Sequence, residues 1–439
     1  MCCPAGNAQL SLSRRLAIAI DLGTTTIAAS LLDTTTGERL AIAGSLNPQR
    51  LYGADVISRL EAAHASADNR RKMAALVNGA LADMVGKLLD DASASPHDLT
   101  GIAIAGNPAM EHLLLGLPVE SIAFPPYRPL FTSGRTITTD ELGWDVTVPA
   151  MIFPLPGGFV GGDLVAFLYG QSLAGSRSAV LVPSPGSRLL LDMGTNGELA
   201  LQVGEVIFAT SAAAGPAFEG GNLACGMAAL AGAIHRVTIT GDRLELSVIG
   251  GGTPSGICGS GVIESIAGLL QAGVIDSSGR LLNRAEIPSN LANRVEDVAG
   301  QFVFVLYRDA RTTVYLSQED IRQVQLAKGA IRAGMEVLCE RAGIRCDAIR
   351  DVVLTGSFGA ELSPRSLKNL GIFTGNMVEI ASFVREGALR GVEQSLCSPD
   401  GFDRVARLAE SIRVIPLSGT PAFEKHFLEQ MNFPLAAYS

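Results

Sequence analysis

The chain has 439 residues, of which 47% are hydrophobic and 18% are charged, a composition typical of a globular protein with two or three domains. The formal net charge of −9 and the lack of any Lys- and Arg-rich run argue against binding to DNA or RNA. Apolar stretches stay well below the ~20 residues that a membrane helix needs. Residues 1–9 also lack the pattern of a secretory signal. We therefore expect a cytoplasmic protein that binds neither nucleic acid nor membrane.

The first half predicts a strand meander followed by helices. Residues 1–14 are typical of a mobile tail, and the short apolar runs after them are broken by Gly and polar turns. Residues 117–150 are rich in Pro, Thr and Gly and predict an irregular excursion. The expected strands cover residues 16–20, 26–32, 40–45 and 101–105, and the expected helices cover residues 55–64, 70–89 and 110–115.

The second half of the sequence begins with the same pattern of predicted strands and turns as the first. Gly, Ser and Pro in residues 174–187 indicate a hinge, so we expect subdomains at residues 15–180 and 181–439, with the C-terminal helix packing back on the first. Beyond the hinge the order of strand, Asp, turn, strand, strand recurs. Ser317 predicts the N-cap of a long helix, with Asp320 in capping-box position. Residues 274–312 give no clear pattern. The expected strands cover residues 189–192, 198–203, 205–210 and 351–354, and the expected helices cover residues 259–272 and 320–343.

The seven cysteines are dispersed along the chain. Their odd number does not predict a disulfide framework, and their spacing is not that of zinc or iron–sulfur ligands. Cys258 has an apolar, glycine-rich setting that favours a buried packing role over that of a redox thiol. His112 follows a turn on an apolar helix and predicts a hydrogen-bonded side chain rather than a metal ligand.

The turn after the first strand carries the first motif that suggests chemistry. Asp21 ends the strand, Gly23 follows, and Thr24, Thr25 and Thr26 complete the turn. Gly23 permits a tight turn where a phosphate can approach the backbone, and the threonines offer hydroxyl and N–H donors. A carboxylate at a strand end can hold Mg²⁺ through water. The alternative is an ordinary polar hairpin.

A second motif repeats this chemistry, and a third is weaker. The second motif consists of Asp192, Gly194, Thr195, Asn196, Gly197 and Glu198. Two such turns, each opening a similar half, favour a function because opposed turns can grip phosphates from both sides. The third motif contains Gly356, Ser357 and Gly359, where a strand-to-helix turn places backbone donors near a nucleotide.

Together these motifs resemble the phosphate-one, phosphate-two and adenosine motifs of the actin-like ATPase superfamily. Further segments are similar, in order, to the reductive activators of corrinoid proteins, and the resemblance covers residues 15–434. These segments are residues 47–49, 52–59, 106–110, 126–129, 159–163, 214–221, 256–261 and 325–331. The resemblance implies an α/β fold with two RNase H-like subdomains of the actin and sugar-kinase type. Their mixed sheets are flanked by helices, and an ATP cleft lies between them.

The resemblance also implies a task. The activators use ATP to drive the reduction of a corrinoid (cobalamin) protein from Co(II) to Co(I). ATP, Mg²⁺, a corrinoid protein partner and a homodimer are therefore implied. The family usually carries an iron–sulfur ferredoxin domain, but no cysteine-rich domain precedes Leu16 or follows Pro434. We therefore expect no iron–sulfur cluster in this chain, and either a separate iron–sulfur electron donor or another ATP-driven task.

The same resemblance implies roles for individual residues. Asp21 and Asp192 are expected to coordinate hydrated Mg²⁺ and to orient the attacking water. The residues expected at the phosphates are Thr24, Thr25, Thr195 and Asn196, in turns that also contain Gly23, Thr26, Gly194 and Gly197. The residues expected at the adenosine are Gly356, Ser357 and Gly359.

Three residues carry two interpretations each. Asp163 lies in a Gly-Gly-Asp turn at a helix start and is either the general base or an N-cap. Glu219 is either a ribose contact or a turn carboxylate. Lys328 lies on a long helix, where it either contacts adenine or ribose or belongs to a solvated face.

Two rival functions come from the same superfamily. A small-molecule kinase would use Asp163 on a substrate and yield a phosphorylated product. A non-catalytic nucleotide-dependent scaffold would bind ATP and turn it over very slowly without a client.

Overall fold

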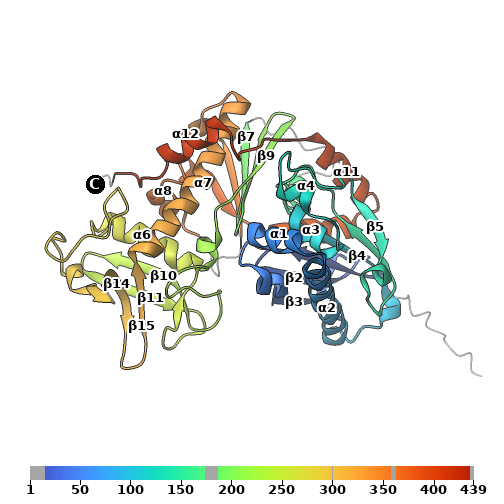
Figure 1. Ribbon diagram of the computed structural model, residues 1–439, viewed down its shortest axis with the longest axis horizontal. Coiled ribbons are helices and arrows are strands. Elements are labelled where there is room, and N and C mark those ends of the chain that lie inside the picture. The colour runs from blue at the N-terminus through green and yellow to red at the C-terminus, as the bar shows by residue number, and fades with distance from the viewer. Residues whose placement is uncertain (1–14, 174–185, 299, 357–361, 436–439) are drawn as a thin grey trace, which may run out of the picture.

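The structure is a computed structural model that describes residues 15–173, 186–298, 300–356 and 362–435. The expected tail at residues 1–14 and most of the expected hinge lie outside the described residues. Figure 1 shows two halves side by side, with the chain running from the first sheet on one side to the inserted sheets of the second half on the other.

The first half is built on a six-stranded sheet in the order β3-β2-β1-β4-β6-β5. β1, β2 and β3 form an antiparallel meander, and β4 pairs with the other edge of β1 in parallel. β1 lies at the centre and is buried along almost its whole length, as its run of Leu, Ile and Ala predicts. The strands are β1 (Leu16–Leu22), β2 (Thr26–Asp33), β3 (Glu38–Leu46), β4 (Leu99–Gly106), β5 (Arg135–Thr138) and β6 (Pro149–Ile152).

The segment 117–150 is more regular than its composition predicts. It contains α4 (Glu120–Ala123), β5 and the start of β6, which pairs with β4 in parallel and with β5 antiparallel. The expectation of an irregular excursion is wrong for these strands. Each has only four residues, so the sheet rather than a visible local pattern determines their conformation.

The second half repeats the arrangement in a sheet of order β17-β16-β7-β8-β9-β18. β7, β8 and β9 form the antiparallel meander and β16 pairs with β7 in parallel, as β4 does with β1. The internal repeat expected from the sequence is therefore confirmed. The strands are β7 (Ser187–Met193), β8 (Gly197–Val203), β9 (Val206–Ala212), β16 (Asp351–Thr355), β17 (Ala381–Phe383) and β18 (Ile412–Val414).

A long insertion separates β9 from the next helix of the repeat. It carries two three-stranded sheets, of order β11-β10-β12 and β13-β14-β15, and the helix α6 (Gly259–Gln271). The region 274–312 that gave no sequence pattern contains the first two strands of the second of these sheets. The strands of the two sheets are β10 (Ala233–Thr240), β11 (Arg243–Val248), β12 (Gly256–Ile257), β13 (Val295–Val298), β14 (Gln301–Arg308) and β15 (Thr313–Ser317). We call residues 213–317 the inserted subdomain.

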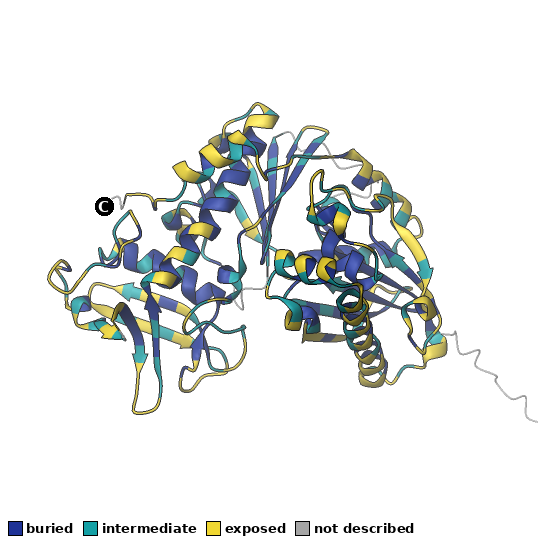
Figure 2. Cartoon of the chain, in the orientation of Figure 1, coloured by how far each residue is buried: buried dark blue, intermediate teal, exposed yellow. Residues whose placement is uncertain are grey.

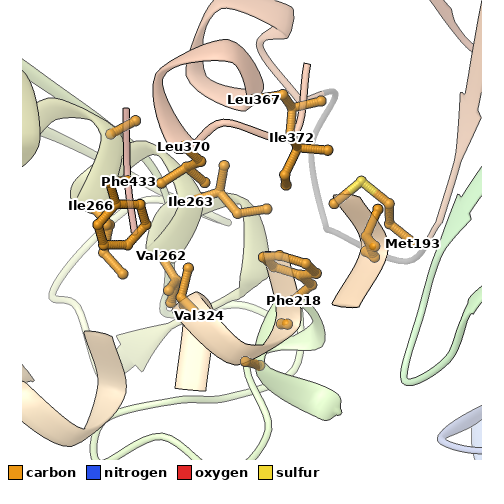
Figure 3. Close-up of a cluster of buried hydrophobic side chains, with 14 of the residues drawn as sticks. Met193, Phe218, Val262, Ile263, Ile266, Val324, Leu367, Leu370, Ile372 and Phe433 are labelled. Carbon is orange, nitrogen blue, oxygen red and sulfur yellow. The ribbon is translucent and has the colours of Figure 1, made fainter. Parts of the chain in front are cut away.

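The outer helices bury one apolar face each and leave the other exposed, as Figure 2 shows for the long helices. α1 (Val56–Ala65), α2 (Ala67–Asp91) and α3 (Pro108–Leu114) contribute to the core of the first sheet. α7 (Gln318–Ala342) packs on β8 and β9, and Ser317 and Asp320 form its capping box as expected. α8 (Pro364–Leu370) packs against α6 and α9 (Met377–Ile380), and part of this core appears in Figure 3.

Three helices fill the space between the two main sheets. α5 (Gly162–Leu173), α10 (Gly387–Cys397) and α11 (Gly401–Ser411) form one core with residues of both sheets, among them Ala103 and Leu190. α10 lies on β1, and Arg39 of β3 pairs with Glu386 and Glu393 at distances of 2.8 and 2.7 Å. The chain thus returns to the first half through α10, whereas its last helix, α12 (Pro421–Glu429), packs on α7.

None of the helices in the described part of the chain combines the length and the apolar character needed to cross a membrane.

Candidate nucleotide site

Two hairpin turns of the central strands form the core of the candidate site. In the first, β1 and β2 are joined through residues 23–25, and a side chain on Gly23 would meet the Thr26 carbonyl oxygen at 2.5 Å. In the second, β7 and β8 are joined through residues 194–196, and a side chain on Gly197 would meet Ile331 of α7 at 2.7 Å. Glycine is required at both positions because the space for a Cβ atom is already filled.

The two turns meet each other across the halves of the molecule. The Thr25 and Thr195 hydroxyl oxygens lie 2.8 Å apart. Both hydroxyls donate to the same oxygen of Glu219, with Thr25 Oγ1 3.0 Å from Glu219 Oε2. Three of the residues singled out from the sequence thus form one hydrogen-bonded cluster, although Thr25 and Glu219 are 194 positions apart.

Carboxylates surround this cluster and affect one another. Burial, followed by the charges of Asp192, Asp163 and Glu386, holds the pKa of Asp21 well above its usual range. Burial, followed by the charges of Asp163 and Glu219, raises the pKa of Asp192 to about 7. Asp21, Asp163 and Asp192 are therefore close enough to repel one another, and the site favours a bound cation.

Asp163 is positioned by the two glycines before it. A Cβ atom on Gly161 would lie 2.5 Å from Asn107 Cα, and one on Gly162 would lie 2.5 Å from Glu111 Oε1. The start of α5 therefore lies directly on the end of β4, which only glycines allow. Asp163 Oδ1 accepts the Leu164 N–H at 2.8 Å, and burial raises the pKa of Asp163 to about 6. The carboxylate thus makes a local helix-start contact and also lies among the acidic groups.

Burial raises the pKa of Glu219, while the hydrogen bonds from Thr195 and Thr25 oppose this shift. Its carboxylate is directed at the hydroxyls of Thr25 and Thr195. A ribose contact by Glu219 stays a prediction.

Two asparagines support the first turn. Asn107 Oδ1 accepts the Met110 N–H and so caps α3, while its Nδ2 donates to Thr24 Oγ1 at 2.9 Å. Asn47 Nδ2 donates to the Gly23 carbonyl oxygen at 2.9 Å. The sequence predicted no role at the site for Asn107 or Asn47, because neither long-range bond leaves a local pattern.

Two further carboxylates lie at the site: Glu198, which the sequence placed in the second motif without a role, and Glu111, which was missed. Glu198 lies directly opposite Asp192 in the β7–β8 ladder, and burial followed by the charges of Asp163 and Asp192 raises its pKa well above its usual range. This pairing was readable, since Asp192 and Glu198 stand symmetrically about Thr195. Glu111 of α3 is also buried, with a raised pKa caused first by burial, and its Oε1 accepts the Gly106 N–H. No sequence signal marks it.

The other motif residues predicted to bind the nucleotide lie in or next to the two turns, or outside the described residues. Gly356 follows Thr355, which pairs with Asp192 in the second sheet, so Gly356 is adjacent to the second motif. Ser357 and Gly359 lie outside the described residues. Thr26 begins β2, and Gly194 and Asn196 form the second turn through a Gly194 N–H to Asn196 oxygen bond of 3.1 Å.

Lys328 contacts the C-terminal segment. It is 1% exposed, its Nζ donates to the Asn432 carbonyl oxygen at 2.5 Å, and it lies 5.3 Å from the centre of the Phe433 ring. Burial, followed by the charge of Arg332, lowers its pKa to about 8. The solvated alternative for Lys328 is therefore wrong, and its nucleotide contact stays a prediction.

His112 and Cys258 occupy buried positions. His112 Nδ1 lies 2.7 Å from the Pro108 carbonyl oxygen, and its Nε2 accepts the Leu130 N–H. Cys258 is fully buried before α6, where its thiol contacts the Ile234 carbonyl oxygen at 3.4 Å. Both positions agree with the packing roles expected from the sequence.

The repeated sheets, with an aspartate, glycine and threonine turn at the centre of each, define an ASKHA-type protein, the class that includes sugar kinases and actin. A family model described as the C-terminal domain of RACo, the ASKHA domain, matches residues 187–439, and one described as the RACo middle region matches residues 16–176. The first covers more than half of the chain, so the chain belongs to this family.

Individual relatives agree with this assignment. A corrinoid activation enzyme, RamQ of Eubacterium limosum, is 29% identical over 428 residues, which are 95% of this chain and 70% of that protein. A [Co(II) methylated amine-specific corrinoid protein] reductase of Methanosarcina barkeri is 22% identical over 461 residues, with 96% of this chain and 78% of that protein covered. A solved reductive activator for a corrinoid, iron–sulfur protein superposes with a TM-score of 0.86 at 28% identity, over 97% of this chain and 67% of that one.

Proposed function

We propose that this chain is an ATP-dependent enzyme that drives the one-electron reduction of a corrinoid protein from Co(II) to Co(I). ATP and water yield ADP and phosphate, and the electron comes from a separate donor, for which an iron–sulfur protein is chemically suited. The relatives named above support the corrinoid substrate. The proposal includes a homodimer, which light scattering of the purified chain measures directly.

The proposal that the chain binds ATP rests on the contact between the two turns. Hydroxyls of Thr25 and Thr195, from opposite halves, converge within 2.8 Å of each other. Such paired donors suit the oxygens of a phosphate chain, which accepts hydrogen bonds from both sides. Asn107 and Asn47 fix the first turn, and the close contact of Gly197 with Ile331 fixes the second. The donors are therefore preorganised.

The acidic groups fit a divalent cation held through water. In the described chain no three His, Cys, Asp or Glu side chains are arranged to bind a metal directly. Burial and neighbouring negative charges nevertheless raise the pKa of both Asp21 and Asp192, and a hydrated cation would stabilise their ionised forms. Both would hold Mg²⁺ through its water ligands, and bound Mg²⁺ neutralises charge on the phosphates.

Each residue around the attacking water has a proposed role. Thr24, Thr25, Thr195 and Asn196 hold the phosphates, and Asp21 and Asp192 orient the water. Asp163 accepts its proton, since a carboxylate whose pKa lies near 6 is a better base than an ordinary aspartate and is mostly ionised at neutral pH. Gly356, Ser357 and Gly359 line the adenosine side, and Lys328 completes the set proposed to contact the nucleotide.

Product analysis separates this proposal from a small-molecule kinase. We expect purified protein to release ADP and inorganic phosphate in equal amounts, faster in the presence of a corrinoid protein. ADP formed without free phosphate, together with a phosphorylated metabolite detected by mass spectrometry, would establish the kinase instead. Tight binding of ATP with no turnover, even with the corrinoid protein present, would favour the scaffold.

Replacing Asn107 with Asp tests the support of the first turn. The carboxylate keeps the acceptor that caps α3 but loses the donor to Thr24 Oγ1. Because Asn107 is buried and close to Asp163, we expect the added charge to lower stability by about 1–3 kcal/mol, and affinity for a non-hydrolysable ATP analogue to fall about tenfold. Calorimetric titration and thermal unfolding measure the two quantities. Unchanged affinity would contradict a role for Asn107 in positioning Thr24.

A further inference from the structure

Glu219 occupies the position that the phosphate-motif hydroxyls offer to a ligand. Its Oε2 accepts from Thr25 of the first half and from Thr195 of the second. Each hydroxyl has one proton to donate, so neither can serve Glu219 and a phosphate oxygen at the same time. The carboxylate is also an anion, and it repels an incoming phosphate.

We propose that the Glu219 carboxylate is an internal substitute for a nucleotide phosphate, which holds the two turns together until a phosphate displaces it. This inference rests on the ATP site proposed above and gives Glu219 a role opposite to that of a nucleotide ligand. Nucleotide binding then has to break two hydrogen bonds to Glu219 before it gains its own.

Glu219 lies near the start of the inserted subdomain, and its backbone connects the site to the helix and sheets of that subdomain. Glu219 ends a 3-10 turn, η4 (Pro216–Glu219), which closes on Gly220 at a φ of +80°, a left-handed conformation. A Cβ atom on Gly259, the first residue of α6, would lie 1.7 Å from the Phe218 carbonyl oxygen. Backbone therefore touches backbone where η4 meets the start of α6.

The neighbouring side chain anchors the same turn. Phe218 is fully buried, and Figure 3 shows it in one apolar cluster with Met193 of the second motif strand and with Val262 and Ile263 of α6. α6 in turn packs on β10 of the inserted subdomain. A displacement of Glu219 consequently shifts η4 against α6, and the inserted subdomain is the part of the molecule that receives the signal of an occupied phosphate site.

Replacing Glu219 with Gln tests the displacement. Gln has nearly the same shape but carries no charge, so it holds the hydroxyls less strongly and does not repel phosphate. We expect the dissociation constant for AMP-PNP, measured by calorimetric titration, to fall about tenfold relative to wild type. Glu219→Asp, which keeps the charge but shortens the reach, is expected to lie between the two. Glu205→Gln, at an exposed turn of the same half, is the control and should bind as wild type does.

The possible outcomes distinguish the displacement of Glu219 from the ATP site on which it rests. Weaker or unchanged AMP-PNP binding by Glu219→Gln, with wild type binding normally, would overturn the displacement and leave the ATP site standing. Failure of both proteins to bind AMP-PNP would overturn both proposals.

Hydrogen exchange tests the link from η4 to α6, which a measurement of affinity does not test. We expect AMP-PNP to change amide exchange at η4 and at the start of α6 in wild type. Unliganded Glu219→Gln should already show the exchange of the nucleotide-bound wild type there. Exchange in these segments that responds neither to AMP-PNP nor to the substitution would refute the link to the inserted subdomain.

Discussion

Asp192→Asn is expected to abolish turnover while making the unliganded protein more stable. The substitution preserves volume but removes a charge that neighbouring carboxylates oppose. We expect the rate of ATP hydrolysis to fall at least about 100-fold, because Asp192 is proposed to orient the water and the hydrated cation.

The stability gain depends on pH in a defined direction. Burial, Asp163 and Glu219 raise the pKa of Asp192 from 3.8 to about 7 in the folded protein. Between these values the folded state holds a proton that the unfolded state has released, so wild-type stability falls as the pH rises through this window. The variant does not titrate there. Its advantage should therefore be small near pH 4 and approach about 4 kcal/mol above pH 7, since the shift spans about three pH units.

Urea unfolding at several pH values, without nucleotide or Mg²⁺, measures this difference. Asp83→Asn, at an exposed position of α2, is the matched control and should change neither stability nor turnover appreciably. A variant that is less stable than wild type at pH 8 would contradict the mutual repulsion of the acidic groups. One that keeps normal turnover would contradict the proposed role of Asp192 in hydrolysis.

The second large effect is expected where α5 and α10 cross between the two sheets. A Cβ atom on Gly391 would lie 1.7 Å from the Ala166 carbonyl oxygen, and one on Gly170 would lie 3.1 Å from Gly391 Cα. The helices therefore touch through their backbones. We expect Gly391→Ala to reduce the free energy of unfolding by about 3 kcal/mol, because the helices must separate to admit one methyl group.

Gly79→Ala provides the control for this substitution. Gly79 lies on the exposed face of α2, with open space at its Cβ position, so alanine should stabilise the protein by about 0.5–1 kcal/mol. Urea unfolding of both variants tests the comparison. If Gly391→Ala were as stable as wild type, the close crossing of α5 and α10 would be wrong.

The sequence predicted the repeat because each half opens with a short local signal. An apolar strand ending in Asp21 or Asp192, then glycine and threonine, is visible without any knowledge of the other half. Since the first strand of each meander carries this signal, the orders β3-β2-β1 and β7-β8-β9 follow from the sequence. The fold class and the family were confirmed for this reason.

Other features were not predictable because they depend on distant contacts. The strands β5 and β6 are too short to show a period, and the inserted subdomain interrupts the repeat with sheets of its own. Glu111 and Lys328 are charged residues on helices, and only the packing of β4 or the C-terminal segment shows that they are buried. The bond from Thr25 to Glu219 joins two halves that no local pattern connects.

The most direct test of the account follows cobalt and phosphate together. The purified protein is mixed with a corrinoid protein from the same organism in its Co(II) state, a low-potential reductant and Mg²⁺, with and without ATP. We predict that the Co(I) absorbance appears only when ATP is present, in step with phosphate release, and that AMP-PNP does not replace ATP. Formation of Co(I) at the same rate without ATP, or phosphate release with no change at cobalt, would contradict the proposed coupling.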